Sequence, residues 1–396
     1  MATAMSMARR ANRPWLTAVW EHVLRQVPPR NLANNTTPLS SVPRRLLVVK
    51  VHGMGDAVLI RLVLEQLKSR HPELDIGVLA GTATVEVLTL DSNFRVHMYS
   101  QKDLGISSII ATFRAIRHCD YEAVLNFEQV AVAGTAFLAA TGIPVRLGFL
   151  GPGEHSKARF LTHAWHFNHH QSMWETFVAL AQLLDPGLSV TTGAFPIRCG
   201  RATERWVQEW WGSRIGKAAK PVVLHIGSAQ GMDFRRWPVQ RFVRLAEELG
   251  SRIRGLTILL TGTDAEKELI QRFASEYSGN CIDASELGSI ERTIGILGRC
   301  ELLVSNDTGI MHLGAAMGVP TVGLFGPNTP RHWAPIGLRA TYVYDTDAPC
   351  SPCIDNYRNR LPIACSNSIK SRCMYDISVD SVLAAVRRVV AHDWMP

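Results

Sequence analysis

From Leu46 onward, the hydrophobic and polar positions follow the pattern of strands alternating with helices. Leu46–Val51 is a mostly apolar run, which predicts a buried strand, and a turn with two glycines, His52–Asp56, follows it. Ala57–Arg70 then has apolar residues at helical spacing. Further predicted strands are Ile76–Leu79 and Ala123–Phe127, and further predicted helices are Thr84–Leu90 and Ile106–Arg117. This alternation predicts a parallel sheet covered on both faces.

The alternation pauses near Pro196 and then starts again. The second series has predicted strands at Val222–Ile226, Leu256–Thr261, Leu302–Ser305 and Thr321–Phe325, and predicted helices at Pro238–Leu249, Asp264–Tyr277 and Gly309–Met317. The length of 396 residues suits about two domains of roughly 150 residues each. We therefore expect an α/β protein with two Rossmann-like domains, at residues 46–195 and 196–396.

The first 45 residues are expected to form a basic amphipathic extension and a linker. Apolar side chains between Trp15 and Val27 fall on one helical face, and Pro28-Pro29 ends the predicted helix. Three interpretations of this helix stay open. Residues 14–27 lie on an anionic membrane surface, or they pack on the body or on another subunit of a homo-oligomer, or the segment is an organelle transit peptide.

The net charge of +8 belongs mainly to this extension. Residues 1–45 hold seven arginines and one acidic residue, which leaves only +2 for the other 351 residues. A body so close to neutral does not favour nucleic acid as a partner. No stretch supplies the roughly 20 apolar residues of a membrane-spanning helix, and Met1–Arg13 lacks the apolar core of a signal peptide. We expect a cytoplasmic protein, peripheral on the inner membrane face if the helix binds lipid.

One candidate catalytic residue comes directly after the first predicted strand. In Lys50–Asp56, the glycines allow a ligand to approach the backbone. The carboxylate of Asp56 follows the carboxyl end of a strand, where open α/β sheets bind ligands. The motif is not the G-x-G-x-x-G of dinucleotide-binding proteins. The alternative is that Asp56 only caps the helix that follows.

Two further candidate motifs follow strands of the second half. Asn306–His312 joins a strand to a helix, and the free N–H groups of a helix start suit a phosphate or diphosphate. The alternative is a simple helix cap at Asp307 or Thr308. His225–Ser228 ends another strand, and the loop after it leads to Arg235, which can bind phosphate oxygens without a metal. The alternative for this loop is a solvated basic surface.

Together, the three motifs resemble those of glycosyltransferase family 9, the heptosyltransferases of lipopolysaccharide core assembly. The resemblance rests on Lys50–Asp56, Gly227–Pro238 and Asn306–His312, the last continuing to Gly326-Pro327-Asn328, and it covers roughly residues 46–390. It implies the GT-B fold, in which two Rossmann-like domains face each other across a cleft. The acceptor would bind mostly to the first domain and the nucleotide-sugar mostly to the second.

The resemblance also implies roles for single residues. Asp56 would be the base that takes the proton of the acceptor hydroxyl, and no cofactor would be needed for catalysis. The donor would be bound by Gly55, Gly227, Ser228, Arg235, Asp264, Asp307, Thr308, Gly309 and His312. Arg235 and the helix start would hold the departing diphosphate, with His312 beside it and Asp264 at the nucleoside. Lysine is usual at the position of Arg235 in lipopolysaccharide heptosyltransferases, so this chain departs from the pattern there.

The function that the resemblance implies is inverting sugar transfer. Heptose would move from ADP-heptose to a saccharide hydroxyl of lipopolysaccharide core or a similar cell-surface glycan. Three alternatives stay open. They are a sugar-nucleotide epimerase or hydrolase on the same fold, a protein-directed heptosyltransferase with a four-cysteine metal knuckle, and a non-catalytic GT-B scaffold that builds an oligomer.

Four of the eight cysteines fall within 24 residues near the C-terminus. Cys350, Cys353, Cys365 and Cys373 begin with a C-x-x-C pair, which is typical of tetrahedral thiolate sites for structural Zn or Fe. Reduced thiols and disulfides are the alternatives, and a reducing cytoplasm disfavours disulfides. Because sulfur would fill all four metal positions, no site for a catalytic water would remain.

Two other groups of polar residues are interpreted as structural. Asp345-Thr346-Asp347 has the D-x-D form of metal-dependent glycosyltransferases, but it comes late in the chain and is predicted to be a loop. Five histidines between His155 and His170 have no acidic or cysteine partner before Glu175. We expect a structural role for them, with contact to the acceptor as the alternative.

Overall fold

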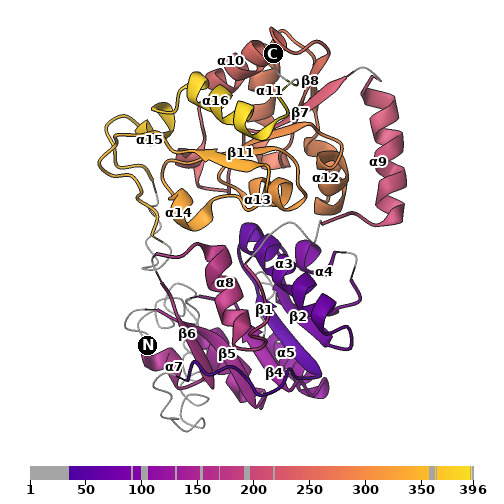
Figure 1. Ribbon diagram of the computed structural model, residues 1–396, viewed down its shortest axis with the longest axis vertical. Coiled ribbons are helices and arrows are strands. Elements are labelled where there is room, and N and C mark those ends of the chain that lie inside the picture. The colour runs from indigo at the N-terminus through magenta and orange to yellow at the C-terminus, as the bar shows by residue number, and fades with distance from the viewer. Residues whose placement is uncertain are drawn as a thin grey trace. The chain divides into compact units, whose positions relative to one another are not determined.

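The computed structural model describes residues 35–90, 92–99, 106–129, 132–151, 155–168, 170–190, 197–216, 219–355, 362, 364–392 and 394. The helix expected at residues 14–27 lies outside this part of the chain and stays a prediction. The described residues form two compact units (Figure 1). One unit holds the residues up to Gly53 with Ile60–Val190, and the other holds Met54–Leu59 with the residues from 197 onward.

The first unit is built on a parallel sheet of six strands. These are β1 (Arg45–Lys50), β2 (Asp75–Gly81), β3 (Arg95–Tyr99), β4 (Ala123–Asn126), β5 (Val145–Leu150) and β6 (His163–His166). Their spatial order is β3-β2-β1-β4-β5-β6. The apolar run Leu46–Val49 forms the central strand β1, where its side chains are buried. The direction in which strands are added reverses between β1 and β4, so the carboxyl ends of these strands mark the expected ligand position.

Six helices accompany this sheet in the described residues. They are α3 (Met54–Arg70), α4 (Val85–Thr89), α5 (Ile106–His118), α6 (Val132–Ala140), α7 (His155–Ala158) and α8 (Met173–Gln182). Gly53 precedes α3 with a φ of 86°, a conformation that favours glycine. A capping box starts α8, because Ser172 and Glu175 each accept the backbone N–H of the other. Local sequence therefore determines where these two helices begin.

The second unit repeats this architecture. Its strands are β7 (Lys220–His225), β8 (Leu256–Leu260), β9 (Cys281–Asp283), β10 (Leu302–Asn306), β11 (Thr321–Leu324) and β12 (Ala340–Val343). The order is β12-β11-β10-β7-β8-β9, and all neighbours are parallel. The strand order reverses between β10 and β7, so the carboxyl ends of these strands are the ligand position of this sheet.

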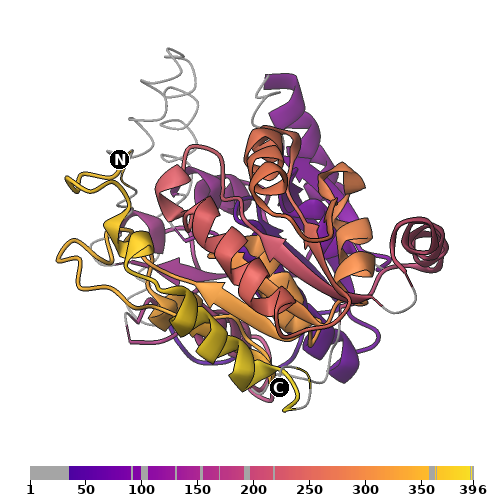
Figure 2. The same cartoon turned by 90° about the horizontal axis from the view of Figure 1, so that it is seen from above.

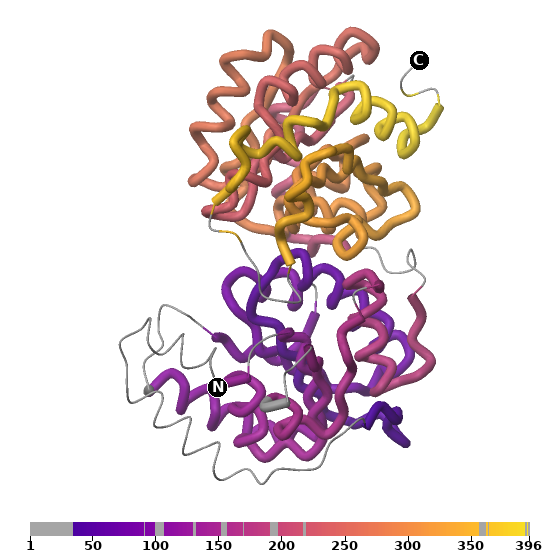
Figure 3. The backbone as a smooth tube through the Cα atoms, turned by 90° about the vertical axis from the view of Figure 1, so that its left-hand side faces the viewer, coloured from indigo at the N-terminus to yellow at the C-terminus, as the bar shows by residue number. Residues whose placement is uncertain are grey.

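Helices cover both faces of the second sheet. They are α9 (Arg201–Arg214), α10 (Val239–Gly250), α11 (Lys267–Glu276), α12 (Ile290–Leu297), α13 (Gly309–Ala316), α14 (Pro330–Trp333), α15 (Arg372–Tyr375) and α16 (Val379–Val389). The trace in Figure 3 follows this unit to α16, in yellow, which shares one core with α10 and the sheet. Helix α13 contacts the sheet and α12, and α9 lies outside α12 (Figure 2).

The two parallel sheets confirm the expected α/β fold class with two Rossmann-like units. Most of the predicted strands, including the runs at 46–51, 222–226 and 302–305, coincide with β1, β7 and β10. Within the described ranges, no helix is long and apolar enough to cross a membrane.

Candidate active site

The turn between β10 and α13 is the centre of the candidate donor site. Asp307 directly follows β10, and Nη2 of Arg235 lies 2.6 Å from its Oδ2 atom. Asn328 donates a further hydrogen bond to the same oxygen at 2.9 Å. The structure therefore brings together two residues that the resemblance placed in one site. The interpretation of Arg235 as part of a solvated basic loop is wrong, because its side chain is paired and only 17% exposed.

Helix α13 starts at this turn with Thr308 in the N-cap position and Gly309 as the first helical residue. The Thr308 side chain makes no capping hydrogen bond, and its hydroxyl lies 3.2 Å from that of Ser305. Asp307 is committed to its ion pair. Thr308 is thus the N-cap residue, as one alternative had it, but its hydroxyl makes no capping bond, and N–H groups of a first helical turn are donors suited to an anion.

His312 lies in the first turn of α13 and is 3% exposed. Burial lowers the pKa of His312 to about 4, with Asp307 acting to raise the pKa and Arg235 acting to lower it. The imidazole is therefore neutral at neutral pH. Its Nδ1 atom and the Nε atom of Arg235 are buried and have no hydrogen-bond partner in the described part of the chain. Buried polar atoms normally have a partner, so a polar ligand would complete this site.

Asn306, the last residue of β10, connects the turn to the loop after β7. Its side-chain amide donates to the carbonyls of Ile226 and Gly227, each at 2.9 Å. Its oxygen accepts the backbone N–H of Trp237 at 2.9 Å. A single buried amide thus holds both ends of the loop that carries Arg235. Asn306 lies within a motif recognised from the sequence, but its role became visible only in the structure.

Glu266 fixes Gly227 and Ser228, although the sequence analysis did not select it. Its buried carboxylate accepts the backbone N–H groups of Ser228 at 2.8 Å and Thr263 at 2.9 Å. A Cβ atom at Gly227 would lie 1.7 Å from Oε1 of Glu266, so any side chain there would have to displace this carboxylate. Asp264 lies on the exposed turn beside this network. The spacing Thr263-x-x-Glu266 is that of a capping box, a signal that sequence reasoning can recognise.

The candidate base Asp56 lies in the first turn of α3, after the carboxyl end of β1, and is 9% exposed. Gly53 is the N-cap residue, which makes Gly55 the second and Asp56 the third residue of the helix. The alternative that Asp56 caps the helix is therefore wrong. Its place next to the reversal of strand order is the one expected for a residue that meets a ligand.

Residues 109–363 match the family model described as glycosyltransferase family 9 (heptosyltransferase). The chain belongs to glycosyltransferase family 9. This membership confirms the glycosyltransferase interpretation over the epimerase and scaffold alternatives. A relative is the lipopolysaccharide heptosyltransferase 2 of Salmonella typhimurium, which is 25% identical over 329 residues, or 76% of this chain and 87% of that protein.

Solved structures of family 9 and related enzymes have the same fold. The ADP-heptose lipopolysaccharide heptosyltransferase II of E. coli matches with a TM-score of 0.68 at 17% identity and covers 88% of this chain and 99% of that one. The iron-containing dodecameric glycosyltransferase TibC from enterotoxigenic E. coli matches with a TM-score of 0.53 at 11% identity, over 89% and 77% of the two chains. The GT-B fold class implied by the sequence motifs is confirmed.

The four late cysteines of this family 9 enzyme gather in one region of the second unit. Burial, together with the neighbouring thiols of Cys353, Cys350 and Cys365, raises the pKa of Cys373 to about 12. All eight cysteines are free thiols, so no disulfide joins any of the four. In the residues that the structure describes, however, no group of three or more His, Cys, Asp or Glu side chains is arranged to hold a metal ion. The metal site stays a prediction.

Of the two groups interpreted as structural, the D-x-D segment has such a role, while the interpretation of the histidines stays a prediction. Asp345 accepts a hydrogen bond from Ser381 at 2.9 Å, and Thr346 donates to Asp376 at 2.7 Å, so the D-x-D segment is a fixed loop after β12. His163 lies on β6, where burial lowers its pKa. His169 is outside the described residues.

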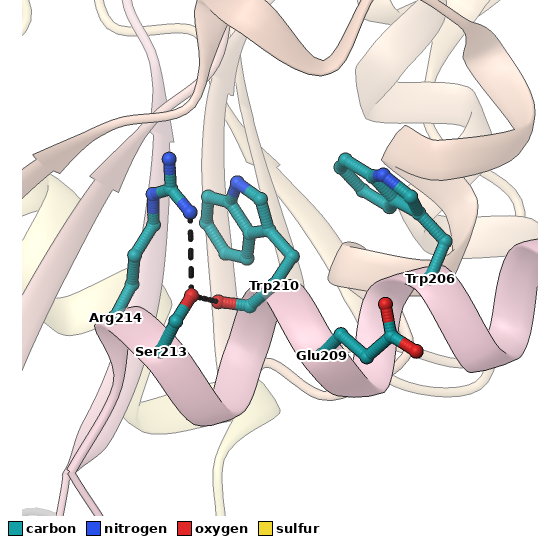
Figure 4. Close-up of a pocket in the computed structure, with 5 residues that line it drawn as sticks. All are labelled: Trp206, Glu209, Trp210, Ser213 and Arg214. Carbon is teal, nitrogen blue, oxygen red and sulfur yellow. Dashed lines mark hydrogen bonds between the residues drawn. The ribbon is translucent and has the colours of Figure 1, made fainter.

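One pocket of about 320 Å³ lies along α9, away from the turn after β10 (Figure 4). It is lined by Trp206, Glu209, Trp210, Ser213 and Arg214. The indole rings of Trp206 and Trp210 are nearly parallel, with centroids 6.4 Å apart. The guanidinium of Arg214 lies 5.1 Å from the Trp210 ring. No residue selected from the sequence lines this pocket, so it is separate from the candidate donor site.

Proposed function

We propose that this glycosyltransferase moves heptose from ADP-heptose to a saccharide hydroxyl of lipopolysaccharide core or a similar cell-surface glycan. The observation that carries the proposal is the buried pair of Arg235 and Asp307 at the start of α13, beside the unpartnered Nδ1 atom of His312. The names of the Salmonella and E. coli heptosyltransferases support heptose as the sugar and ADP as the nucleotide.

In this proposal, the donor diphosphate binds at the start of α13. Arg235 and the N–H groups of the first helical turn offset its negative charge, which is the electrostatic work that a metal ion does in other transferases. Asp307 is also negative, but Arg235 and Asn328 both contact its Oδ2 atom and offset that charge. Neutral His312 supplies one hydrogen bond. The other residues assigned to donor binding are Gly55, Gly227, Ser228, Asp264, Thr308 and Gly309.

Asp56 is the proposed base. Its carboxylate takes the proton of the acceptor hydroxyl as the acceptor oxygen forms a bond to the anomeric carbon. The bond between that carbon and the diphosphate oxygen breaks, and ADP leaves. Attack from the face opposite ADP inverts the anomeric centre. A positioned carboxylate of this kind typically contributes about 10²–10⁴-fold to the rate.

The first test is the choice of nucleotide. We expect ADP to raise the thermal midpoint of the full chain selectively in a series with UDP, GDP and CMP. A ligand that binds only the folded protein adds about 2.7 kcal/mol of stability at 100 times its Kd. The measurement is differential scanning fluorimetry at equal nucleotide concentrations. A larger shift with UDP or GDP would replace the sugar donor, and equal shifts with all four would contradict a specific donor site.

We further propose a structural Zn or Fe ion on Cys350, Cys353, Cys365 and Cys373. The nearness of the four thiols supports it, since each of the other three acts to raise the pKa of Cys373. The iron content named for TibC is a second support. A bound cation favours the deprotonated thiolates, so metal ligation would lower the thiol pKa that the neighbouring cysteines raise. Such an ion would hold the loop and supply no step of the transfer.

Elemental analysis of untreated protein tests the cysteine site. We expect about one equivalent of Zn or Fe per chain, as four thiolates complete one tetrahedral site. Cys353→Ser should lose the metal, whereas Cys300→Ser should keep it, because Cys300 is buried at the end of α12 and bonds the carbonyl of Ile296. Protein without metal, or equal metal content in both variants, would contradict the site.

The location and assembly of the protein are a further part of the proposal. We propose a cytoplasmic enzyme that forms a homo-oligomer, a state for which the dodecameric TibC is a precedent. Attachment to the inner membrane face would depend on residues 14–27, which lie outside the described residues.

A further inference from the structure

The loop between β1 and α3 is held by a carboxylate from the neighbouring strand. Glu128 lies two residues beyond β4, which pairs with β1 at the reversal of strand order. Its Oε1 atom accepts the backbone N–H of Val51 at 2.7 Å and that of His52 at 3.0 Å. Both hydrogen bonds join residues more than 70 positions apart in the chain. A single side chain thus fixes two successive peptide groups directly before α3.

Hydrogen bonds hold the backbone of Glu128 in place. Its backbone N–H donates to the Asn126 side chain at 3.0 Å. The ammonium of Lys157, a fully buried residue on α7, donates to the carbonyls of Glu128 at 2.9 Å and Gln129 at 2.8 Å. The side chain of Glu128 is 16% exposed. These bonds fix the backbone of Glu128, so its carboxylate reaches the loop from an anchored position.

The charge of Glu128 is stable over the working pH range. Burial alone would raise its pKa, but the charge of buried Lys50 and the hydrogen bonds from His52 and Val51 bring the pKa down to about 2. A group with so low a pKa stays ionised at neutral pH and is a poor proton acceptor. Glu128 is therefore suited to hold a loop and not to act as a base.

We propose that Glu128 is a positioning residue for the transfer reaction, which fixes the peptide groups of Val51 and His52 and thereby sets the place of Asp56. The chain runs from His52 through Gly53 directly into the first turn of α3, where Asp56 is the third residue. A shift of about 1 Å in a reacting group can cost about 10²-fold in rate. The proposal rests on the proposed role of Asp56 as the base.

A matched set of variants of the full chain tests this role. Glu128→Ala removes the acceptor of both N–H groups, and we expect kcat to fall about 10- to 100-fold. Glu128→Gln keeps an oxygen acceptor of the same reach, so its kcat should stay within about threefold of the unmodified protein. Glu122→Ala is the control, because Glu122 accepts the N–H of Arg44 at 2.8 Å at the opposite end of the same strand pair. It should also stay within about threefold.

The readout is ADP release from ADP-heptose with a truncated lipopolysaccharide core as acceptor, together with the thermal shift by ADP. We expect the kcat of Glu128→Ala to fall while the thermal shift caused by ADP stays equal to that of Glu122→Ala. General unfolding would instead reduce both quantities. If Glu128→Ala does not fold, Glu128→Asp replaces it, since the shorter carboxylate keeps the charge but cannot reach both N–H groups.

Equal kcat values for the Glu128 and Glu122 variants would overturn the proposal, as would a loss in Glu128→Gln as large as that in Glu128→Ala. The Asp56→Asn variant, run in parallel, separates the two proposals. If it keeps normal turnover, the assignment of the base fails. If it is inactive while Glu128→Ala is normal, only the positioning role fails.

Discussion

Replacing Asp56 with asparagine is expected to reduce sugar transfer by about 10²–10⁴-fold, the usual contribution of a general base. The amide has nearly the shape of the carboxylate, but it cannot take the proton of the acceptor hydroxyl. Asp56 lies in the first turn of α3, and Gly53 is the N-cap residue, so the substitution leaves the cap residue itself unchanged. We therefore expect the thermal shift by ADP to stay unchanged. Single-turnover transfer from ADP-heptose measures the chemical step directly.

Glu65→Gln is the control for this variant. Glu65 lies on the same helix and pairs with Arg61 one turn before it, so its replacement also removes one carboxylate from α3. Its transfer rate should remain within about threefold of the unmodified protein, since Glu65 lies nine residues along α3 from Asp56, roughly 13 Å at 1.5 Å per residue. Transfer by Asp56→Asn at the rate of this control would show that another group accepts the proton.

Replacing Arg235 with alanine is expected to weaken ADP binding by about 10- to 100-fold, because a hydrogen bond to a charged group contributes about 1.5–3 kcal/mol and each 1.4 kcal/mol is tenfold. The loss has a second cause. Without Arg235, the nearly buried carboxylate of Asp307 keeps only Asn328 among these partners and repels the diphosphate. Titration calorimetry with ADP measures the affinity, and thermal unfolding measures the cost to the free protein.

Three further variants separate the two causes. Arg235→Lys keeps the charge and should bind ADP within about tenfold of the unmodified protein. Arg235→Ala with Asp307→Asn should recover the thermal midpoint but not the affinity. Arg244→Ala, on the exposed face of α10, should change neither quantity. ADP affinity that is unchanged in Arg235→Ala would contradict the placement of the diphosphate at α13.

The sequence predicted the central strands well because burial on both faces leaves little choice of residue. β1, β7 and β10 each contain a run of apolar residues, and nearly all of their residues are buried. The edge and outer elements gave weaker patterns. β3 exposes most of its side chains, β6 has histidine at both ends, and only Val207 and Trp210 of α9 are buried. None of these three elements was expected, since an exposed element leaves little apolar periodicity in the chain.

The candidate site shows the same division between local and distant information. Asp56, Asp307 and His312 are found from the sequence because each lies in a short motif between a strand and a helix. Glu128 and Glu266 were missed because their partners are 77 and 38 positions away, and the sequence does not specify which strands become neighbours. Glu128 follows a strand just as Asp56 does. Charged residues after any predicted strand end therefore merit the same scrutiny.

The close packing of Gly227 against Glu266 also limits how this protein can diverge. Any side chain at position 227 would displace a carboxylate that binds two peptide groups. The smallest step, glycine to alanine, therefore loses those hydrogen bonds unless position 266 has already become shorter. Gly227→Ala is therefore expected to release the loop at Ser228 and the turn at Thr263 together, because one carboxylate binds both peptide groups.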